Sequence, residues 1–176
     1  MQLDTVFVWI LSLCMAQLLG MAAWHKFKNM TEFKLVLSGY ELLPFSLLDA
    51  ASKLIMVLEC LTALALLLPS TRLLGALLAA SLMFLYGCAM AINLLHGRRL
   101  LDCGCHINSQ KQPISWHLVI RNLMFAGTML LLLLPESARV LNLLDWALIL
   151  FGVVIGSLIY LIYNQLNYAQ SLQLKG

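Results

Sequence analysis

The chain has 176 residues, of which 62% are hydrophobic and 11% charged, with a formal net charge of +3 and a mean hydropathy of +0.90. A soluble domain usually carries about twice that share of charged residues, and a chain of this length cannot bury so much apolar surface in one core, so the composition excludes an ordinary soluble protein. The few basic residues are scattered near the ends of apolar stretches and in loops, which favours orientation in a lipid bilayer over binding of nucleic acid.

Five apolar stretches follow one another along the chain, and each is long enough to cross a bilayer as a helix at about 1.5 Å per residue. They cover residues 6–24, 45–68, 73–95, 114–134 and 144–163. The strand-like alternation of a transmembrane barrel is absent from these stretches. The sequence therefore predicts an all-α fold, a single membrane domain over residues 1–176 that forms a polytopic bundle of four to five transmembrane helices.

A short helix is predicted after the first stretch, over Thr31–Ser38. Phe33 and Leu37 fall on one face of this helix, while Lys34 and Ser38 fall on the other. Such a helix would lie along the membrane interface with its apolar face toward the lipid. A plain amphipathic linker is the alternative interpretation.

The other long connection is the loop over residues 96–113. Five spans would place this loop, the short helix and the C-terminus on one side of the membrane. That side carries Lys26, Lys28, Lys34, Arg98, Arg99, Lys111 and Lys175, against Arg72 and Arg139 on the other. The positive-inside rule therefore favours a cytoplasmic loop. This prediction conflicts with the usual location of disulfide chemistry outside the cytoplasm.

The loop contains two cysteines, Cys103 and Cys105, separated only by Gly104. A disulfide between them would close a very small ring, and glycine allows the backbone dihedrals that such a ring needs. Strained and exposed disulfides are labile and oxidising, which suits thiol exchange. Asp102 and His106 flank the pair and could tune its thiolate, since a carboxylate raises the pKa of a cysteine and an imidazolium lowers it.

Two alternatives for the pair stay open at this stage. Cys103, Cys105 and His106 could hold a soft metal such as Zn, Cu(I) or Hg(II), although a closed zinc site needs four ligands and the sequence has no second pair at a familiar spacing. The cysteines could also be ordinary loop residues. The remaining three, at positions 14, 60 and 88, lie inside apolar stretches and are most simply small buried hydrophobes.

Polar residues also occur inside the apolar stretches. Glu59 lies in the middle of the second stretch, Lys53 lies at comparable depth there on another face, and Arg121 and Asn122 lie about two turns into the fourth. A carboxyl group at such a position is costly unless it is paired or protonated. One interpretation is a polar cluster under the cysteine loop that binds a ligand, a quinone or a proton. The other is an internal ion pair that fixes helix packing.

Several motifs occur in a fixed order between residues 33 and 135. They are Tyr40-Glu-Leu-Leu-Pro44, Glu59, Asn93-Leu-Leu-His-Gly-Arg98, Asp102-Cys-Gly-Cys105, Ile114-Ser-Trp116 and Arg121-Asn122. In this order they resemble the MauE group of the wider DoxX-like membrane proteins. One departure is that His106 and Ile107 follow the cysteine pair where the family often has Phe-Gly.

The resemblance implies a thiol–disulfide redox protein of the bacterial inner membrane. It would work with MauD, a thioredoxin-like protein, to form the disulfides of a periplasmic client enzyme such as methylamine dehydrogenase. Cys103 and Cys105 would carry the exchange, and Glu59, Arg121 and Asn122 would support the loop from within the bundle. This role would place the loop on the periplasmic face, against the charge count. A non-catalytic assembly factor is the remaining alternative.

Overall fold

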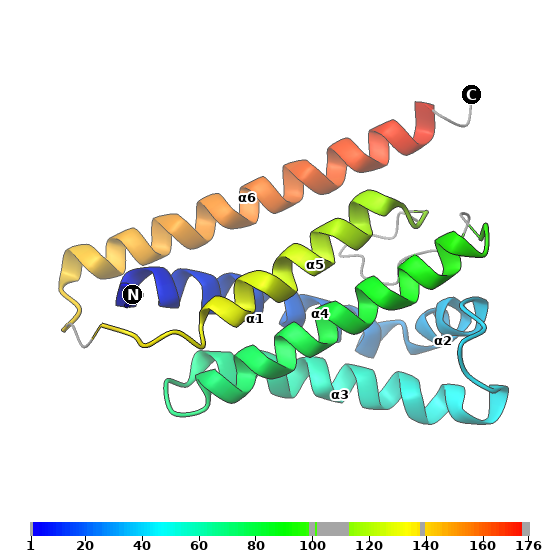
Figure 1. Ribbon diagram of the computed structural model, residues 1–176, viewed down its shortest axis with the longest axis horizontal. Helices are drawn as coiled ribbons and strands as arrows, with labels where there is room; N and C mark the ends of the chain where they lie inside the picture. Colours follow the sequence, from blue (N-terminus) through cyan, green and yellow to red (C-terminus); the bar gives the residue numbers. More distant parts are fainter. Residues whose placement is uncertain (1, 99–100, 102–112, 138–139, 174–176) are drawn as a thin grey trace.

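A computed structural model of the protein describes residues 2–98, 101, 113–137 and 140–173, with the helix backbone alone at residues 168 and 170–173. This part of the chain is helical and contains no β-strand; an isolated β-bridge pairs Leu3 with Glu136. The prediction of an all-α fold is therefore confirmed. In chain order the elements are α1 (Thr5–Lys28), α2 (Met30–Gly39), η1 (Phe45–Leu47), α3 (Leu48–Leu67), α4 (Arg72–Leu95), α5 (Trp116–Leu131) and α6 (Leu143–Gln173) (Figure 1).

Four helical segments are long and apolar enough to cross a membrane by length and composition. They are Thr5–Lys28, Phe45–Leu67, Arg72–Leu95 and Leu143–Asn167. α5 has 16 residues, which corresponds to about 24 Å, and it packs along α4 (Figure 1). The protein is therefore a multi-pass membrane bundle with four candidate spans and a fifth, shorter helix beside them.

Local sequence explains where α1 begins and where α3 ends. α1 begins after Asp4, whose carboxylate accepts a hydrogen bond from the backbone N–H of Val6 at 2.8 Å and so caps the helix. α3 ends before Leu68, which is extended because Pro69 follows it and disfavours the helical conformation of the preceding residue.

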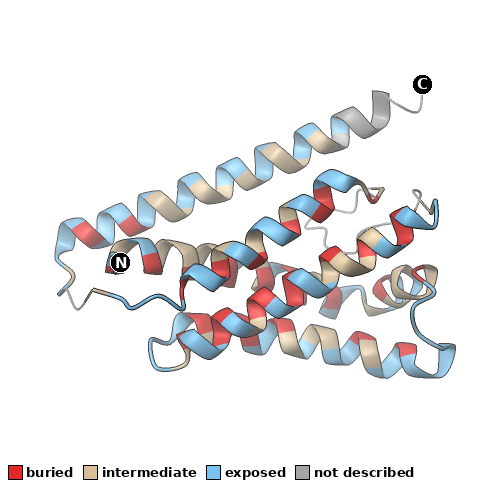
Figure 2. Ribbon diagram, in the orientation of Figure 1, coloured by how far each residue is buried: buried red, intermediate tan, exposed pale blue. Residues whose placement is uncertain are grey.

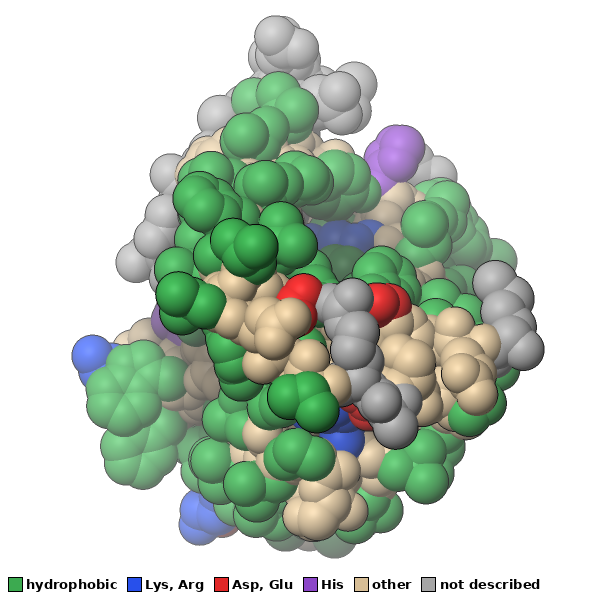
Figure 3. Space-filling model, turned by 90° about the vertical axis from the view of Figure 1, so that its left-hand side faces the viewer, with side chains coloured by type: hydrophobic (Ala, Val, Ile, Leu, Met, Phe, Trp, Pro, Cys, Tyr) green, Lys and Arg blue, Asp and Glu red, His purple; other side chains and the backbone are tan. Residues whose placement is uncertain are grey.

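The core lies where α1, α3, α4 and α5 meet, while α6 lies at the edge of the bundle (Figure 2). Small residues on α4 face this core, including the buried Ala76, Ala79 and Ala80, and they allow close helix packing of the kind found in membranes. The outer surface is largely apolar: hydrophobic side chains cover most of the end view in Figure 3, and charged ones show at few points. A lipid environment accounts for this surface.

The short helix predicted over Thr31–Ser38 is present as α2, one residue longer at each end. α2 lies at the same end of the bundle as the last turn of α4 (Figure 1). Arg98, just after α4, forms an ion pair with Glu41, just after α2. A Cβ atom at Gly39 would lie 3.0 Å from the side chain of Leu101, so the chain passes closely over the end of α2.

Candidate functional site

The predicted exchange pair lies outside the described residues, together with its neighbours; these are Asp102, Cys103, Gly104, Cys105 and His106. The structure does describe the two ends of this segment. The backbone N–H of Ile114 donates to the carbonyl oxygen of Leu101 at 2.9 Å. The chain therefore enters and leaves residues 102–112 at one place, at the end of the bundle that holds α2.

A buried carboxylate joins three helices below this end. Glu59 of α3 is 0% exposed, and its Oε1 accepts a hydrogen bond from the ammonium group of Lys26 of α1, which is 1% exposed. The hydroxyl of Tyr86 on α4 donates to the same oxygen at 2.6 Å. One carboxylate oxygen thus accepts two charge-assisted hydrogen bonds, one of them from a cation, and links α1, α3 and α4.

Aromatic rings surround the ammonium group of this pair. The Lys26 nitrogen lies 4.9 Å from the centre of the Phe33 ring and 5.3 Å from that of the Tyr86 ring. Cation–π contact of this kind offsets part of the cost of removing the charge from water. Because Phe33 belongs to α2, the same contact holds the short helix against the bundle.

Lys26 is the residue of this cluster that sequence reasoning missed. At the sequence level it counted among the basic residues flanking the first span, but the structure removes it from the membrane surface. The helical spacing of the sequence could have indicated its burial, because Lys26 falls on the same face of an α-helix as Leu19, Ala22 and Ala23, and all four are buried. Lys53 was predicted to lie at a depth in the membrane comparable to that of Glu59. Its side chain is 62% exposed and forms an ion pair with Asp49 at 2.7 Å.

Arg121 and Asn122 of α5 both turn toward the bundle. Asn122 is 2% exposed, and its amide donates to the carbonyl of Leu118 in its own helix at 2.8 Å. The guanidinium of Arg121 donates from Nη1 to Oδ1 of Asn164 on α6 at 2.7 Å and lies 5.7 Å from the ring of Tyr160. Among the described residues, the partners of Arg121 are therefore an amide and a ring on α6, and no ion pair joins it to Glu59.

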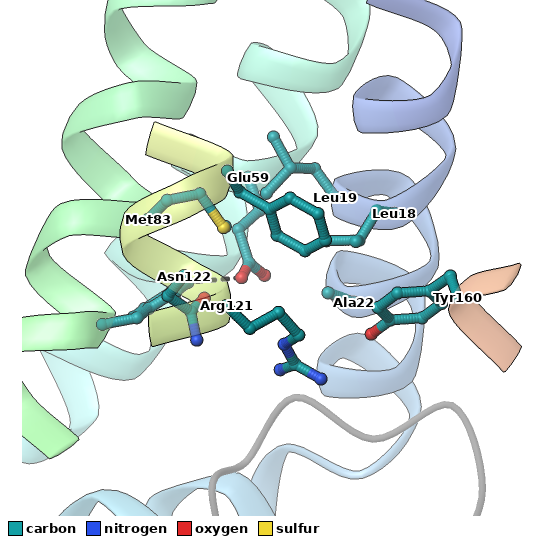
Figure 4. A pocket seen from close by; sticks show the side chains of 10 residues that line it. Leu18, Leu19, Ala22, Glu59, Met83, Arg121, Asn122 and Tyr160 are labelled. Carbon is teal, nitrogen blue, oxygen red and sulfur yellow. Dashed lines mark hydrogen bonds between the residues drawn. The ribbon is translucent and has the colours of Figure 1, made fainter. Parts of the chain in front are cut away.

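Glu59, Arg121 and Asn122 line one small cavity of about 10 Å³, together with Tyr86 and Tyr160. Figure 4 shows the carboxylate of Glu59 and the guanidinium of Arg121 on the two sides of this space. Oε2 of Glu59 and Nε of Arg121 are buried and have no hydrogen-bond partner within the described ranges. A cavity of this size holds about one water molecule. The two atoms thus offer an acceptor and a donor to a small polar group.

Comparison with known proteins gives the family. The model for the family "Methylamine utilisation protein MauE" matches residues 4–135, well over half of the chain. The chain belongs to the MauE family. A MauE relative from Paracoccus versutus is 37% identical over 157 residues, which cover 88% of this chain and 82% of the relative. One from Paracoccus denitrificans is 36% identical over 124 residues, 68% of this chain and 64% of the relative.

A third relative, from Methylophilus methylotrophus, is 40% identical over 117 residues. The chain spans less than two thirds of the length of this protein and of the Paracoccus denitrificans one, at 62% and 64%. All three carry the name "Methylamine utilization protein MauE". No solved structure matches the chain. The region that matches the MauE family contains Lys26, Glu59, Tyr86, Arg121 and the cysteine segment, and it ends before α6.

Proposed function

We propose that this MauE-family chain is a membrane thiol–disulfide redox protein of methylamine utilisation. Cys103 and Cys105 alternate between a disulfide and two thiols, and they exchange with a thioredoxin-like partner that resembles MauD. The exchange supports disulfide formation in a periplasmic enzyme such as methylamine dehydrogenase. The observation that carries the proposal is a Cys-Gly-Cys pair in a segment whose ends, Leu101 and Ile114, are hydrogen-bonded to each other.

The chemistry of the exchange balances without any further group. A thiolate of the partner attacks the Cys103–Cys105 disulfide, which forms a mixed disulfide and releases one cysteine thiolate. A second thiolate of the partner attacks the mixed disulfide, so the partner leaves with a new disulfide and the pair is left as two thiols. Two electrons thereby pass from the partner to the pair.

The other cysteines offer matched controls for this proposal. Cys14, Cys60 and Cys88 are free thiols in α1, α3 and α4, and none of them forms a disulfide in the described part of the chain. Cys60 is exposed on the outside of α3, where lipid would surround it. Replacing it changes the number of thiols without touching the Cys-Gly-Cys pair.

Leaving a single thiol in the pair is expected to trap the partner. In a Cys105→Ser or Cys103→Ser variant the remaining thiolate can attack the disulfide of the oxidised partner and form the mixed disulfide, which is the reverse of the exchange above. The replaced neighbour can no longer displace the partner from it. We expect a larger species on non-reducing gels that disappears on reduction and contains a thioredoxin-like protein. The Cys60→Ser variant should trap nothing. Absence of a trapped partner with either single variant would count against the proposal, and bound zinc or copper lost with Cys103→Ser would support a metal site instead.

We place the protein in the bacterial inner membrane with residues 102–112 on the periplasmic side, because a periplasmic client needs its oxidant there. The basic residues near the ends of the spans favour the opposite side. The structure removes Lys26 from that count, since its charge is buried against Glu59.

A membrane-impermeant maleimide reports the side directly. In intact cells with a permeable outer membrane, we expect Cys103 and Cys105 to be labelled after mild reduction and to be protected before it, because the pair is oxidised at rest. The control is the Cys103→Ser/Cys105→Ser double variant, which should show no labelling. Labelling that requires lysis of the inner membrane would place the segment in the cytoplasm.

A further inference from the structure

A groove separates α6 from α5 along the outside of α1. Its cavity has a volume of about 470 Å³, within the range of small-molecule sites, and most of its lining is apolar. Its polar lining side chains include Gln17, Thr128, Ser157 and Tyr160. α6 comes close to α1 at one edge of the groove, where a Cβ atom at Gly152 would lie 2.6 Å from Ile10. The groove can therefore accept an elongated apolar molecule from the lipid.

This groove adjoins the polar cavity of Glu59 and Arg121. Leu18, Phe125 and Tyr160 line both spaces. Arg121 precedes Met129, which lines the groove, by eight residues of α5, or about 12 Å along the helix axis. A ligand with its tail in the groove would thus carry its polar head toward Arg121, in the half of α5 nearer its N-terminus.

The polar atoms of Arg121 and Glu59 at this end determine which chemical group the ligand can carry as its polar head. Nε of Arg121 is a donor without an acceptor and Oε2 of Glu59 is an acceptor without a donor, among the residues that the structure describes. A phosphate head would meet the Glu59 carboxylate and would not fit a space for about one water molecule. An uncharged quinone ring meets neither obstacle, because the ring itself lies in the groove and only one carbonyl oxygen enters the cavity to accept from Arg121. Reduction turns that oxygen into a hydroxyl that can donate to Glu59.

We propose that the groove binds a lipid-soluble quinone, with a ring carbonyl at Arg121, and that this quinone reoxidises the cysteine pair. The electron-transfer part rests on the proposed function; the binding part rests on the groove alone. Two thiols become one disulfide and release two electrons and two protons, and the quinone takes up both to become a quinol. The charge of Arg121 stabilises the negative charge that develops on the quinone oxygen, and Oε2 of Glu59 accepts a hydrogen bond from the new hydroxyl.

Binding is tested with the purified full chain in lipid nanodiscs and decylubiquinone as the probe. We expect Arg121→Met, which removes the donor, and Thr128→Trp, which fills the groove, each to weaken binding by about tenfold or more. Met124→Trp is the matched control, because Met124 lies one turn away on α5, is 67% exposed and does not line the groove. Leu161→Trp fills the same groove from α6, so the test survives if Thr128→Trp fails to fold.

Two comparisons separate this inference from the proposed function. Decanol has the same tail length as decylubiquinone but lacks the ring. If decanol displaces the bound probe as strongly as unlabelled quinone does, the groove recognises only the alkyl chain, and the proposed quinone site is wrong. The Cys103→Ser/Cys105→Ser variant should bind the quinone with unchanged affinity but produce no quinol, whereas the reduced wild type should produce one quinol per disulfide. Absence of binding would overturn the inference even if a partner is trapped. Binding without quinol formation would overturn the role as electron acceptor.

Discussion

Replacing Lys26 with methionine is expected to lower the free energy of unfolding by about 3–5 kcal/mol, because it leaves the charge of Glu59 in the interior without a cationic partner. Both side chains are almost fully buried and belong to different helices. The remaining hydrogen bond from Tyr86 cannot neutralise the carboxylate. A denaturant titration of the purified protein in detergent measures the change in the free energy of unfolding between wild type and variant.

A matched control is Lys34→Met. Lys34 also forms an ion pair, with Asp49, but both partners of that pair are partly exposed to solvent. Water replaces the lost partner there, so the loss of stability should be far smaller than for Lys26→Met. Equal losses for the two variants would show that burial does not set the cost of breaking the Lys26–Glu59 pair.

The double variant Lys26→Met/Glu59→Met should recover most of the lost stability, because it removes both buried charges together. It also separates the two interpretations of Glu59. If the ion pair only fixes the packing of α1 against α3, the double variant should be stable and functional. If the carboxylate takes part in redox chemistry beside the cavity, the double variant should be stable but inactive.

Loss of both cysteines of the pair is expected to abolish function in cells. We expect that a strain of Paracoccus denitrificans lacking its own MauE relative regains growth on methylamine with the wild-type chain and with Cys60→Ser, but not with Cys103→Ser/Cys105→Ser. The reason is that no other residue of the exchange scheme can replace a thiol. Growth supported by the double variant, with equal amounts of protein in the membrane, would favour an assembly factor without thiol chemistry.

Helix positions were largely predictable, because length and apolarity act locally along the chain. The deviations have local causes as well. The apolar stretch 114–134 runs to Pro135, but α5 ends at Leu131. Residues 132–134 continue as tighter turns with hydrogen bonds to the third residue back, and Pro135 disfavours the helical conformation of Leu134 before it. α6 continues to Gln173, beyond the predicted end at residue 163, because polar residues such as Asn164 leave the lipid without breaking a helix.

The partner of Glu59 was not predictable in the same way. A buried carboxylate signals that some partner exists, and Lys53 was the cation nearest to it in the sequence. Six residues turn an α-helix by about 240° beyond one full turn, so Lys53 and Glu59 cannot share a face. Lys26 lies 33 residues away, and its contact with Glu59 depends on how α1 is rotated against α3.

Four features could be predicted from the amino-acid sequence alone: the class of protein, the helices, the Cys-Gly-Cys pair and the need for a partner at Glu59. Each of these depends on composition, on local periodicity or on the cost of an isolated charge in lipid. The packed structure was needed to show that Lys26 is this partner, that Arg121 turns to Asn164, and that the polar cavity adjoins an apolar groove. The physical reason is that helix rotation and crossing set these contacts, and they are properties of the packed bundle rather than of any one segment.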